Sequence, residues 1–404
     1  MTEARSPFLV TVSGQDAPGI SERLFRALAE CGVEVDDVEQ VRVHGRLLLC
    51  IEADMVHAQV EPVCTLLRER LRGAGVEVTV DPIVESALDD EGGDEGHLHL
   101  VTLLAPEIDA ATLETVTGAI ARCGGNIERI VRLAAYPVHS YELSVAGADV
   151  DSLRRALAEA AVRCQVDLAV QSAGLHRRAK HLIVLDADST LLQGEMIDLL
   201  AERQGCGAEV AAVTAAAMAG EVDFAGALRQ RVRLLAGMKE DDLEAVRSGI
   251  VLTPGARTLV RTLKRLGYEV AVVSGGFTQL LGPLVDDLGI DHVAANTLAV
   301  KDGVVTGELG GPILDRAGKA TALVTFAAAA GVPVARTIAV GDGANDIDML
   351  AAAGLGIAFN AKPVVREAAD AALSVPYLDA ILFLLGISRR EVELADRLEG
   401  EGAR

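Results

Sequence analysis

Three short apolar segments of this chain each end abruptly in acidic residues, a hydroxyl group or glycines. The segments cover residues 182–185, 270–273 and 337–340, and each has the length and composition of a strand that is buried on both faces of a parallel sheet. Ligands of open α/β sheets bind at the carboxyl ends of the strands. The polar residues that follow the three segments are therefore expected at one edge of a sheet. They are Asp186 and Asp188, Ser274 and Gly275, and Asp342 and Asp346.

Asp186 and Asp188 lie two positions apart directly after the first segment. The strand period of two points their side chains in the same direction. Two like charges at such a short separation repel each other in a low-dielectric site unless a cation or a shared proton lies between them. Taken alone, the segment fits equally well a loop with an Asx turn and a helix N-cap at Ser189 or Thr190. The two later segments favour a chemical role.

Phosphoryl transfer is the chemistry that this set of residues fits. An aspartate such as Asp186 can attack phosphorus and form an aspartyl-phosphate. A second acid, Asp188, can protonate the leaving alkoxide and then deprotonate water. Mg²⁺ prefers oxygen ligands, which Asp186, Asp342 and a backbone carbonyl near Asp188 can supply.

The remaining polar residues provide positive charge and hydrogen-bond donors for a phosphoryl group. Lys319 stands at the start of an expected helix. Together with Ser274 and the N–H of Gly275, it can neutralise the phosphoryl oxygens as charge spreads over them. Each element alone has a structural explanation, such as a strand-to-helix turn or a surface lysine. The occurrence of all these elements in one chain, in this order and mostly at strand ends, favours a catalytic site.

The four segments resemble the haloacid dehalogenase superfamily of phosphohydrolases over roughly residues 180–385. The matching segments are Asp186–Thr190, Ser274–Gly276, Lys319 and Gly341–Asp346. The resemblance implies that Asp186 is the nucleophile and that Asp188 is the general acid and base. It also implies Mg²⁺ held by Asp186, the carbonyl of Asp188 and Asp342, with Asp346 as a ligand or an outer-shell acid.

The interval from Asp186 to Ser274 is 88 residues, which is too long for a single crossover helix. The excess, about residues 192–252, has a helical pattern and predicts a small helical cap over the strand ends. Such caps exclude water and select substrates. Before Lys319 the sequence predicts only a hairpin around residues 301–303.

Within the superfamily, the cap segments resemble the phosphoserine phosphatase family. The matching segments are Met218–Phe224, Leu228–Val232, Val273–Phe277 and Glu195, nine residues after the nucleophile. The resemblance implies that Glu195 binds the substrate ammonium and Arg231 its carboxylate, and that Met218 and Phe224 line the site. Asn345 would orient the phosphate or Lys319. Ordinary structural roles in the helices of the cap remain alternatives for Glu195, Arg231, Met218 and Phe224, and a purely structural role remains one for Asn345.

The first 174 residues contain a βαββαβ pattern that occurs twice, with Cys31-Gly32 and Cys123-Gly124 at corresponding places, 92 residues apart. An acidic, glycine-rich stretch at 89–96 predicts a linker between the copies. The predicted domains are residues 1–85, 97–174 and 180–390. Each copy exposes one face of its sheet, so pairing with the other copy or with a partner chain is expected.

The first copy resembles the ACT domain, a small ligand-sensing module of amino-acid metabolism. The matching residues are Val12–Ile20, a strand-to-helix loop in which Gly19 offers N–H groups and Asp16 a carboxylate for an amino acid. A capped helix start without a ligand is the alternative. The second copy has no Asp-x-Pro-Gly in its loop at 105–109, and assembly is its expected role. ACT-type sheet edges favour a homodimer.

The composition narrows the possible partners and location. The net charge of −22 argues against nucleic acid or an anionic membrane surface as partner. No apolar run reaches the roughly 18–20 residues needed to span a bilayer. The six cysteines have no metal-binding spacing and indicate core thiols in a reducing compartment. The sequence thus predicts a cytoplasmic protein.

The expected fold class is α/β, with a C-terminal haloacid dehalogenase-like (Rossmannoid) parallel sheet and a helical cap, preceded by two ACT-like, ferredoxin-like βαββαβ domains. The resemblance implies Mg²⁺-dependent hydrolysis of O-phospho-L-serine, the last step of L-serine biosynthesis, with L-serine as a hypothetical effector at Asp16 and Gly19. One alternative is hydrolysis of another small phosphate ester. The other is an amino-acid sensor with an inactive phosphatase domain.

Overall fold

The computed structural model describes residues 5–83, 98–174, 177 and 179–402 of the chain, without the side chains of Met218 and residues 400–402. The predicted linker at 89–96 lies outside these residues. The chain divides into two compact units, residues 1–95 and residues 96–404. Each unit is described by itself.

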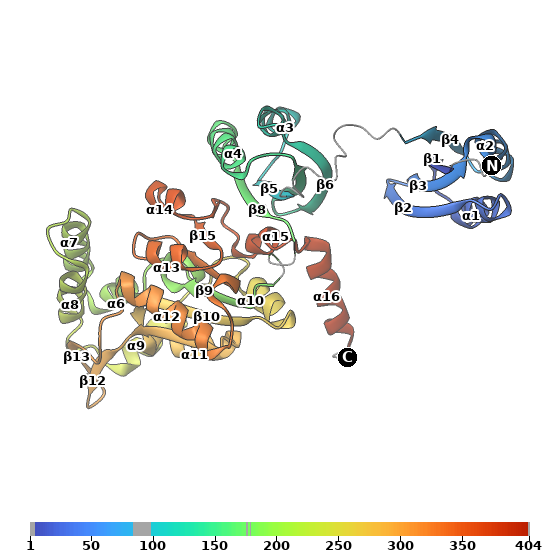
Figure 1. Ribbon diagram of the computed structural model, residues 1–404. Coiled ribbons are helices and arrows are strands. Elements are labelled where there is room, and N and C mark those ends of the chain that lie inside the picture. The colour runs from blue at the N-terminus through green and yellow to red at the C-terminus, as the bar shows by residue number, and fades with distance from the viewer. Residues whose placement is uncertain (1–4, 84–97, 175–176, 178, 403–404) are drawn as a thin grey trace. The chain divides into compact units, whose positions relative to one another are not determined.

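The first unit is a four-stranded antiparallel sheet with two helices on one face (Figure 1). The strand order is β2-β3-β1-β4. Alternate residues of β1 and β3 are buried against the helices, as the strand period requires. The elements are β1 (Arg5–Gln15), α1 (Ile20–Glu30), β2 (Glu34–Val43), β3 (Arg46–Val56), α2 (His57–Arg70) and β4 (Val76–Pro82).

The second unit begins with a module of the same topology, in which the strand order is β6-β7-β5-β8. Helices α3 and α4 begin at Asp109 and Asp149, whose carboxylates cap the free N–H groups of Thr112 and Ser152. The elements are β5 (His99–Ala105), α3 (Ala110–Arg122), β6 (Asn126–Ala135), β7 (His139–Ala146), α4 (Val150–Cys164) and β8 (Asp167–Ser172).

The rest of the second unit is built on a six-stranded parallel sheet in the order β11-β10-β9-β14-β15-β16. The chain starts at the centre with β9, builds outward to β11, and then returns to the other side of β9. The carboxyl ends of β9, β10 and β14 therefore meet where the strand order reverses. The strands are β9 (Leu182–Asp186), β10 (Glu269–Phe277), β11 (His292–Asn296), β14 (Thr337–Gly341), β15 (Gly356–Phe359) and β16 (Ala371–Leu373).

Both faces of this sheet are covered by helices, which explains why the strands are apolar throughout. Ile183 and Leu185 of β9 pack against one layer, which contains α10 (Ala256–Arg265) and α11 (Thr278–Leu288). Leu182 and Val184 pack against the other layer. That layer contains α12 (Arg316–Ala329), α13 (Ile347–Ala352) and α14 (Pro363–Ala368).

Four helices lie between β9 and α10, in the region where the sequence predicts a cap. They are α6 (Met196–Gln204), α7 (Gly207–Met218), α8 (Phe224–Leu234) and α9 (Glu240–Ser248). Helices α7 and α8 lie side by side at one end of the domain (Figure 1). The predicted hairpin is present as β12 (Leu298–Lys301) and β13 (Val304–Leu309), and β13 packs against α8.

The outer face of the second module is covered by the C-terminal domain of the same chain. Leu104, Val138 and Ala169 belong to the same buried cluster as the residues of the parallel sheet. Strand β8 lies beside β16, and the N–H of Ser374 donates to Asp167 over 2.6 Å. The expectation that this face pairs with the other copy or a partner chain is therefore wrong for the second module, because the parallel-sheet domain of the same chain buries that face.

The predicted fold class is confirmed: a parallel α/β domain follows two antiparallel βαββαβ modules. Among the helices in the described residues, none combines the length and hydropathy that a membrane crossing requires. The cysteines lie in or beside the hydrophobic cores, except Cys50: Cys64 is buried, and Cys31, Cys123, Cys164 and Cys206 pack against the core clusters. All six are free, but only Cys64 is buried and the others are half-buried.

Candidate active site

The loop after β9 carries the first two aspartates in a strained conformation. Asp186 ends the strand, and Asp188 lies in a single wide turn closed by a 2.8 Å bond from the N–H of Leu192 to the carbonyl of Ala187. Ser189 has a φ of 56°, which a residue with a side chain seldom adopts. Strain of this kind concentrates at functional sites. The loop therefore places Asp188 and Thr190 at positions that a regular helix would not give.

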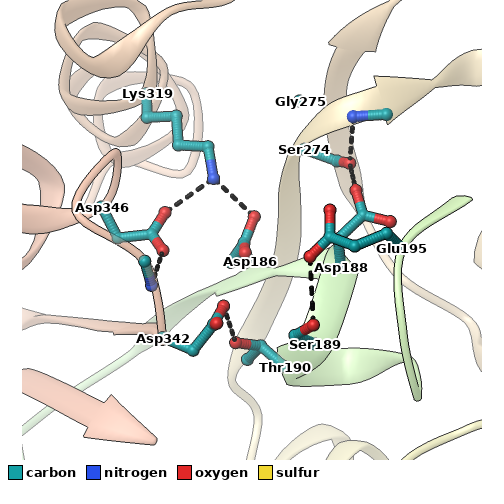
Figure 2. A network of polar contacts seen from close by, with 12 residues as sticks. Asp186, Asp188, Ser189, Thr190, Glu195, Ser274, Gly275, Lys319, Asp342 and Asp346 are labelled. Carbon is teal, nitrogen blue, oxygen red and sulfur yellow. Dashed lines mark hydrogen bonds and ion pairs between the residues drawn. The ribbon is translucent and has the colours of Figure 1, made fainter. Parts of the chain in front are cut away.

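Lys319 lies between two of the acids at the centre of the site (Figure 2). Its ammonium donates to Asp186 Oδ1 over 2.5 Å and to Asp346 Oδ1 over 2.6 Å. All three side chains are at most 5% exposed. A lysine without partners could not remain charged at this depth, so the two carboxylates are needed to hold it. The structure confirms that residues 133 positions apart, Asp186 and Lys319, meet at the strand ends.

Asp188 is held by the cap on one side and by β10 on the other. Its Oδ1 accepts a 2.7 Å bond from the N–H of Met196, and its Oδ2 accepts a 3.1 Å bond from the hydroxyl of Ser274. Ser274 in turn accepts a 2.7 Å bond from the N–H of Gly276. A Cβ on Gly276 would lie 2.1 Å from Met196 Cε and 3.0 Å from both Asp188 Oδ2 and Ser274 Oγ, so these side chains pack closely over the glycine. The carboxylate of Asp188 therefore has a fixed orientation.

Asp186, Asp342 and Asp346 form a group that fits a divalent cation. One carboxylate oxygen from each lies within 4.8 Å of the others. Thr190 donates to Asp342 Oδ1 over 3.4 Å, and the N–H of Gly343 donates to Asp346 Oδ2 over 3.0 Å. Two buried carboxylates and the half-buried carboxylate of Asp342 lie beside a single lysine, which leaves excess negative charge, and an all-oxygen donor set suits a hard cation.

Burial shifts the pKa values of these acids upward. It raises the pKa of Asp186 well above its usual value, with Lys319 opposing the shift and Asp346 and Asp188 adding to it. Burial and then the neighbouring Glu195 raise the pKa of Asp188 to about 7. Burial and then Asp346 raise the pKa of Asp342 to about 6.

The pKa of Lys319 also rises. Burial alone would lower it, but Asp186 and Asp346 outweigh that effect. Perturbed groups that are clustered at strand ends mark a candidate catalytic site.

Two charged residues of the cap region border the acids. Glu195 is exposed and precedes α6, and its Oε1 accepts a 3.1 Å bond from the hydroxyl of Ser189 (Figure 2). Arg231, on α8, is half-buried, and its Nε has no hydrogen-bond partner in the described part of the chain. Burial lowers the pKa of Arg231, while the charges of Glu195, Asp198 and Asp188 oppose the shift. The structure thus brings both predicted head-group residues to the acids.

Of the other three predicted substrate contacts, Phe224 lies at the site, Asn345 lies in a neighbouring turn, and the side chain of Met218 is not described. Phe224 begins α8, and its Cζ lies 3.8 Å from the position of a Cβ on Gly275, so its ring borders the carboxyl end of β10. Asn345 lies in the turn before α13, with its Oδ1 folded over Gly343. Met218 ends α7, and its side chain lies outside the described part of the chain.

Asn296 is a structural residue of the site that the sequence analysis does not identify. It ends β11, is 1% exposed, and donates a 2.8 Å bond to the carbonyl of Gly275. Its Oδ1 accepts a 2.8 Å bond from the N–H of Leu314. It therefore ties the β10 loop to the segment that precedes Lys319. The available signal is its position, since it too is a polar residue at the carboxyl end of a strand of the parallel sheet.

The predicted ligand loop of the first module has a different character. Asp16 forms a 2.6 Å ion pair with Arg42, and its own N–H donates to the carbonyl of Gly45 over 2.8 Å. Gly19 precedes α1 with a φ of 88°, a conformation that favours glycine. The carboxylate that was predicted to hold an ammonium therefore already has a cationic partner.

Comparison with known families agrees with this division of the chain. Residues 183–351 match the haloacid dehalogenase-like hydrolases, and residues 6–81 and 97–171 each match an ACT domain. The match to the second module holds although its loop lacks the residues that carry the resemblance in the first.

Two curated proteins are similar over almost their whole length. A phosphoserine phosphatase of Streptomyces coelicolor is 51% identical over 96% of this chain and 94% of its own. Phosphoserine phosphatase SerB2 of Mycobacterium tuberculosis is 48% identical over 97% of this chain and 96% of its own.

Two crystal structures resemble the chain in three dimensions. A haloacid dehalogenase family hydrolase of Salmonella enterica serovar Typhi has a TM-score of 0.63 and 28% identity, covering 71% of this chain and 98% of its own. A probable phosphoserine phosphatase of Vibrio cholerae, in its unliganded form, has a TM-score of 0.58 and 31% identity. That match covers 71% of this chain and 86% of the Vibrio chain.

Proposed function

Since the chain belongs to the phosphoserine phosphatases, within the haloacid dehalogenase-like hydrolases, we propose that it hydrolyses O-phospho-L-serine to L-serine and phosphate, the last step of L-serine biosynthesis. The observation that carries the proposal is the buried set of Asp186, Asp188 and Lys319 at the strand ends. A sensor with an inactive phosphatase domain would not need to keep these charges buried, because each one costs stability.

In the first step, a carboxylate oxygen of Asp186 attacks phosphorus and the bond from phosphorus to the serine oxygen breaks. Asp188 gives its proton to that oxygen as it leaves. A pKa of about 7 leaves a sizeable protonated fraction of Asp188 near neutral pH, as a general acid requires. The hydroxyl of Ser274, the N–H of Gly275 and the ammonium of Lys319 would bind the phosphoryl oxygens.

In the second step, Asp188 acts as a base. It takes a proton from a water molecule, whose oxygen attacks phosphorus and displaces the carboxylate of Asp186. The products are phosphate and the restored enzyme. The hydrogen bonds that Asp188 accepts from Met196 and Ser274 keep its carboxylate in place through both proton transfers.

We propose Mg²⁺ as the cation of the site. Asp186, Asp342 and the carbonyl of Asp188 would hold it, with Asp346 as a further ligand or as the partner of Lys319. When bound, Mg²⁺ neutralises charge that develops on the phosphoryl group. The support is the cluster of three carboxylates. Burial, and after it the neighbouring acids, raise the pKa values of Asp186 and Asp342, so a cation beside them would stabilise their charged forms.

Glu195 and Arg231 would select a substrate with a zwitterionic head. Glu195 would pair with the ammonium, and the guanidinium of Arg231 would bind the carboxylate through two parallel hydrogen bonds. The support is the position of Glu195 beside Ser189 and the Nε of Arg231, for which the described residues provide no hydrogen-bond partner. Phe224 and Met218 would complete the wall of the site, and Asn345 would orient the phosphate or Lys319.

Phosphate release from O-phospho-L-serine with Mg²⁺, with a matched sample in EDTA, tests the function. We expect turnover that the chelator abolishes. Equal or faster turnover of phosphoglycolate or O-phospho-homoserine would instead support the alternative of another small ester.

Glu195→Gln tests the head-group assignment. The variant is expected to raise KM for phosphoserine by about tenfold or more, since one charge-assisted bond is lost, and to leave KM for phosphoglycolate within about twofold because that ester has no ammonium group. An equal rise in KM for both esters would remove Glu195 from substrate selection.

We further propose that the first ACT-like module mediates homodimer formation and binds L-serine near Asp16 and Gly19. The support for a dimer is its edge strand β2, where Val41 and Val43 are exposed beside Leu48 of β3. Light scattering, which measures the molar mass in solution, tests the dimer: we expect a dimeric wild type and a monomeric Val41→Lys variant. A monomeric wild type would contradict the proposal. A cytoplasmic location remains our prediction from the sequence.

A further inference from the structure

The two chain segments that enter and leave the cap region form a short ribbon. Leu192 and Leu252 form an isolated antiparallel bridge. The N–H of Gln193 donates to the carbonyl of Val251 over 2.8 Å, and its side-chain amide donates to the carbonyl of Leu252 over 3.1 Å. The segment that returns from the cap helices therefore runs directly past the catalytic loop, residues 187–191.

Thr253 is the residue of this returning segment that binds the catalytic loop. Its hydroxyl donates to the carbonyl of Thr190 over 2.7 Å, and its N–H donates to the carbonyl of Leu191 over 2.9 Å. The side chain is 7% exposed, so water cannot readily replace either bond. One residue thus holds two consecutive carbonyl groups of the loop.

The catalytic loop needs support from outside because its own conformation is strained. Asp188 and Ser189 have non-helical backbone angles inside the turn. The hydroxyl of Thr190 points to Asp342 (Figure 2), so the orientation of Thr190 affects a proposed metal ligand as well as the loop. A strained segment persists only when its surroundings determine its conformation. The two bonds from Thr253 to the carbonyl groups of Thr190 and Leu191 meet this requirement.

The two residues that follow Thr253 are held by contacts with residues 378 and 379. The carbonyl of Pro254 accepts a 2.8 Å bond from the N–H of Leu378. Gly255 has a φ of 83°, and a Cβ there would lie 2.2 Å from Asp379 Oδ1, so the turn packs tightly against that side chain. Asp379 is held by a 3.0 Å ion pair with Arg389. The segment 253–255 is therefore a rigid support for the loop.

We infer that Thr253 is a positioning residue of the phosphatase reaction, which holds the catalytic loop in the geometry that Asp188 and Thr190 need for both chemical steps. The inference rests on the proposed function and adds to it a residue that does not touch the substrate. It predicts that loss of the hydroxyl slows chemistry more than it weakens substrate binding, because Glu195 and Arg231 lie outside this contact.

The chain offers a matched control for removal of this hydroxyl group. Thr262, on α10, is also buried at 6% exposure, and its hydroxyl has no hydrogen-bond partner among the residues that the structure describes. Thr253→Val and Thr262→Val make the same chemical change in the same domain. Only the first removes a bond to the catalytic loop.

We expect Thr253→Val to lower kcat for O-phospho-L-serine by about tenfold, which corresponds to one buried hydrogen bond. The KM should change less than twofold, and Thr262→Val should match the wild type in both constants. Hydrogen exchange without Mg²⁺ provides a second readout. Amides of residues 187–194 should exchange faster in Thr253→Val than in Thr262→Val.

Two further variants apply if Thr253→Val does not fold. Thr253→Ser keeps the hydroxyl and Thr253→Cys replaces it by a weak donor of similar size. Wild-type kcat in the serine variant and a lower kcat in the cysteine variant would support the inference. Equal kcat in Thr253→Val and Thr262→Val, or in the serine and cysteine variants, would overturn it. Either result requires an active wild type, and an inactive wild type would contradict the proposed function instead.

Discussion

The two βαββαβ modules share a topology but differ in what covers the outer faces of their sheets. In the first module, Val41, Val43 and Leu48 remain exposed on that face. In the second, Thr102 and Leu104 are 1% exposed because the catalytic domain packs over them. The same supersecondary unit is thus a separate compact unit in one copy and part of the enzyme body in the other.

One ion pair from each module shows how far the two modules differ in burial. Arg42 and Asp16 in the first module are 2.6 Å apart, and so are Arg177 and Glu142 in the second unit. The Arg42 side chain is 67% exposed, whereas that of Arg177 is 5% exposed. Arg177 also donates to the carbonyl of Leu384 over 3.1 Å, which joins the second module to the catalytic domain. Equal distances therefore have different energetic consequences.

The largest effect is expected for Arg177→Met. The substitution leaves the half-buried Glu142 without its partner and removes the buried bond from Arg177 to the carbonyl of Leu384, so the second unit should lose about 3 kcal/mol of unfolding free energy. Urea unfolding of the full-length protein measures this loss. Adding Glu142→Leu should restore most of the stability, because a buried pair can be replaced by apolar side chains at little cost.

Arg42→Met is the matched control in the first module. Exposed ion pairs contribute little, so its unfolding free energy should change by less than about 0.5 kcal/mol. A loss as large as that of Arg177→Met would show that the exposed pair has a structural role that its burial does not indicate. The contrast between the two modules would then fail.

A nearly equal effect is expected from pH, and it should arise in the second unit. The pKa of Asp342 is about 6 in the folded protein and near the usual 3.8 in the unfolded chain, so the folded state binds the proton more tightly. The protonated carboxyl group of Asp342 therefore makes its full contribution to the unfolding free energy below pH 3.8, and this contribution is lost as the pH rises through 6. In EDTA, Asp342→Asn should therefore gain about 3 kcal/mol over the wild type between pH 4 and pH 8.

Thermal unfolding of both proteins in EDTA at the two pH values measures this difference. Addition of Mg²⁺ at pH 8 should raise the Tm of the wild type more than that of Asp342→Asn. If the difference in Tm between Asp342→Asn and the wild type were the same at both pH values, the charge of Asp342 would not be what destabilises the folded protein at high pH.

The smallest effect on basal activity is expected for Asp16→Ala. The residue belongs to the first module and its partner Arg42 is exposed, so kcat and KM without effector should remain within about twofold of the wild type. If L-serine binds at this loop, its effect on the rate should disappear in the variant. An unchanged response to L-serine would remove the loop from the regulatory proposal.

The sequence was sufficient for the catalytic centre because its residues follow apolar strands. Strand ends converge in a parallel sheet, so Asp186, Ser274 and Asp342 could be placed together without a structure. Asn296 follows the same rule and was missed only because its strand, 292–296, is less apolar. Thr253 has no such pattern, since it reaches the site through the path of the chain around the cap helices.

Contacts between domains could not be predicted for a different reason. The alternation of apolar residues predicts which face of a strand is buried but not what covers it. Arg177 lies in a basic stretch that resembles a solvated linker, yet it is buried between two domains. The pairing of Asp16 with Arg42 depends on the fold of a neighbouring strand, which the loop sequence alone does not contain.

Acid quench of the enzyme during turnover of ³²P-labelled phosphoserine tests the central claim most directly. Phosphate should become covalently attached to the peptide that contains Asp186, and the label should be lost on brief exposure to alkali, as expected for an acyl phosphate. Asp186→Asn should show no label and at least about a 10³-fold lower kcat, because the nucleophile is absent. Label at another residue, or full activity in Asp186→Asn, would contradict the account.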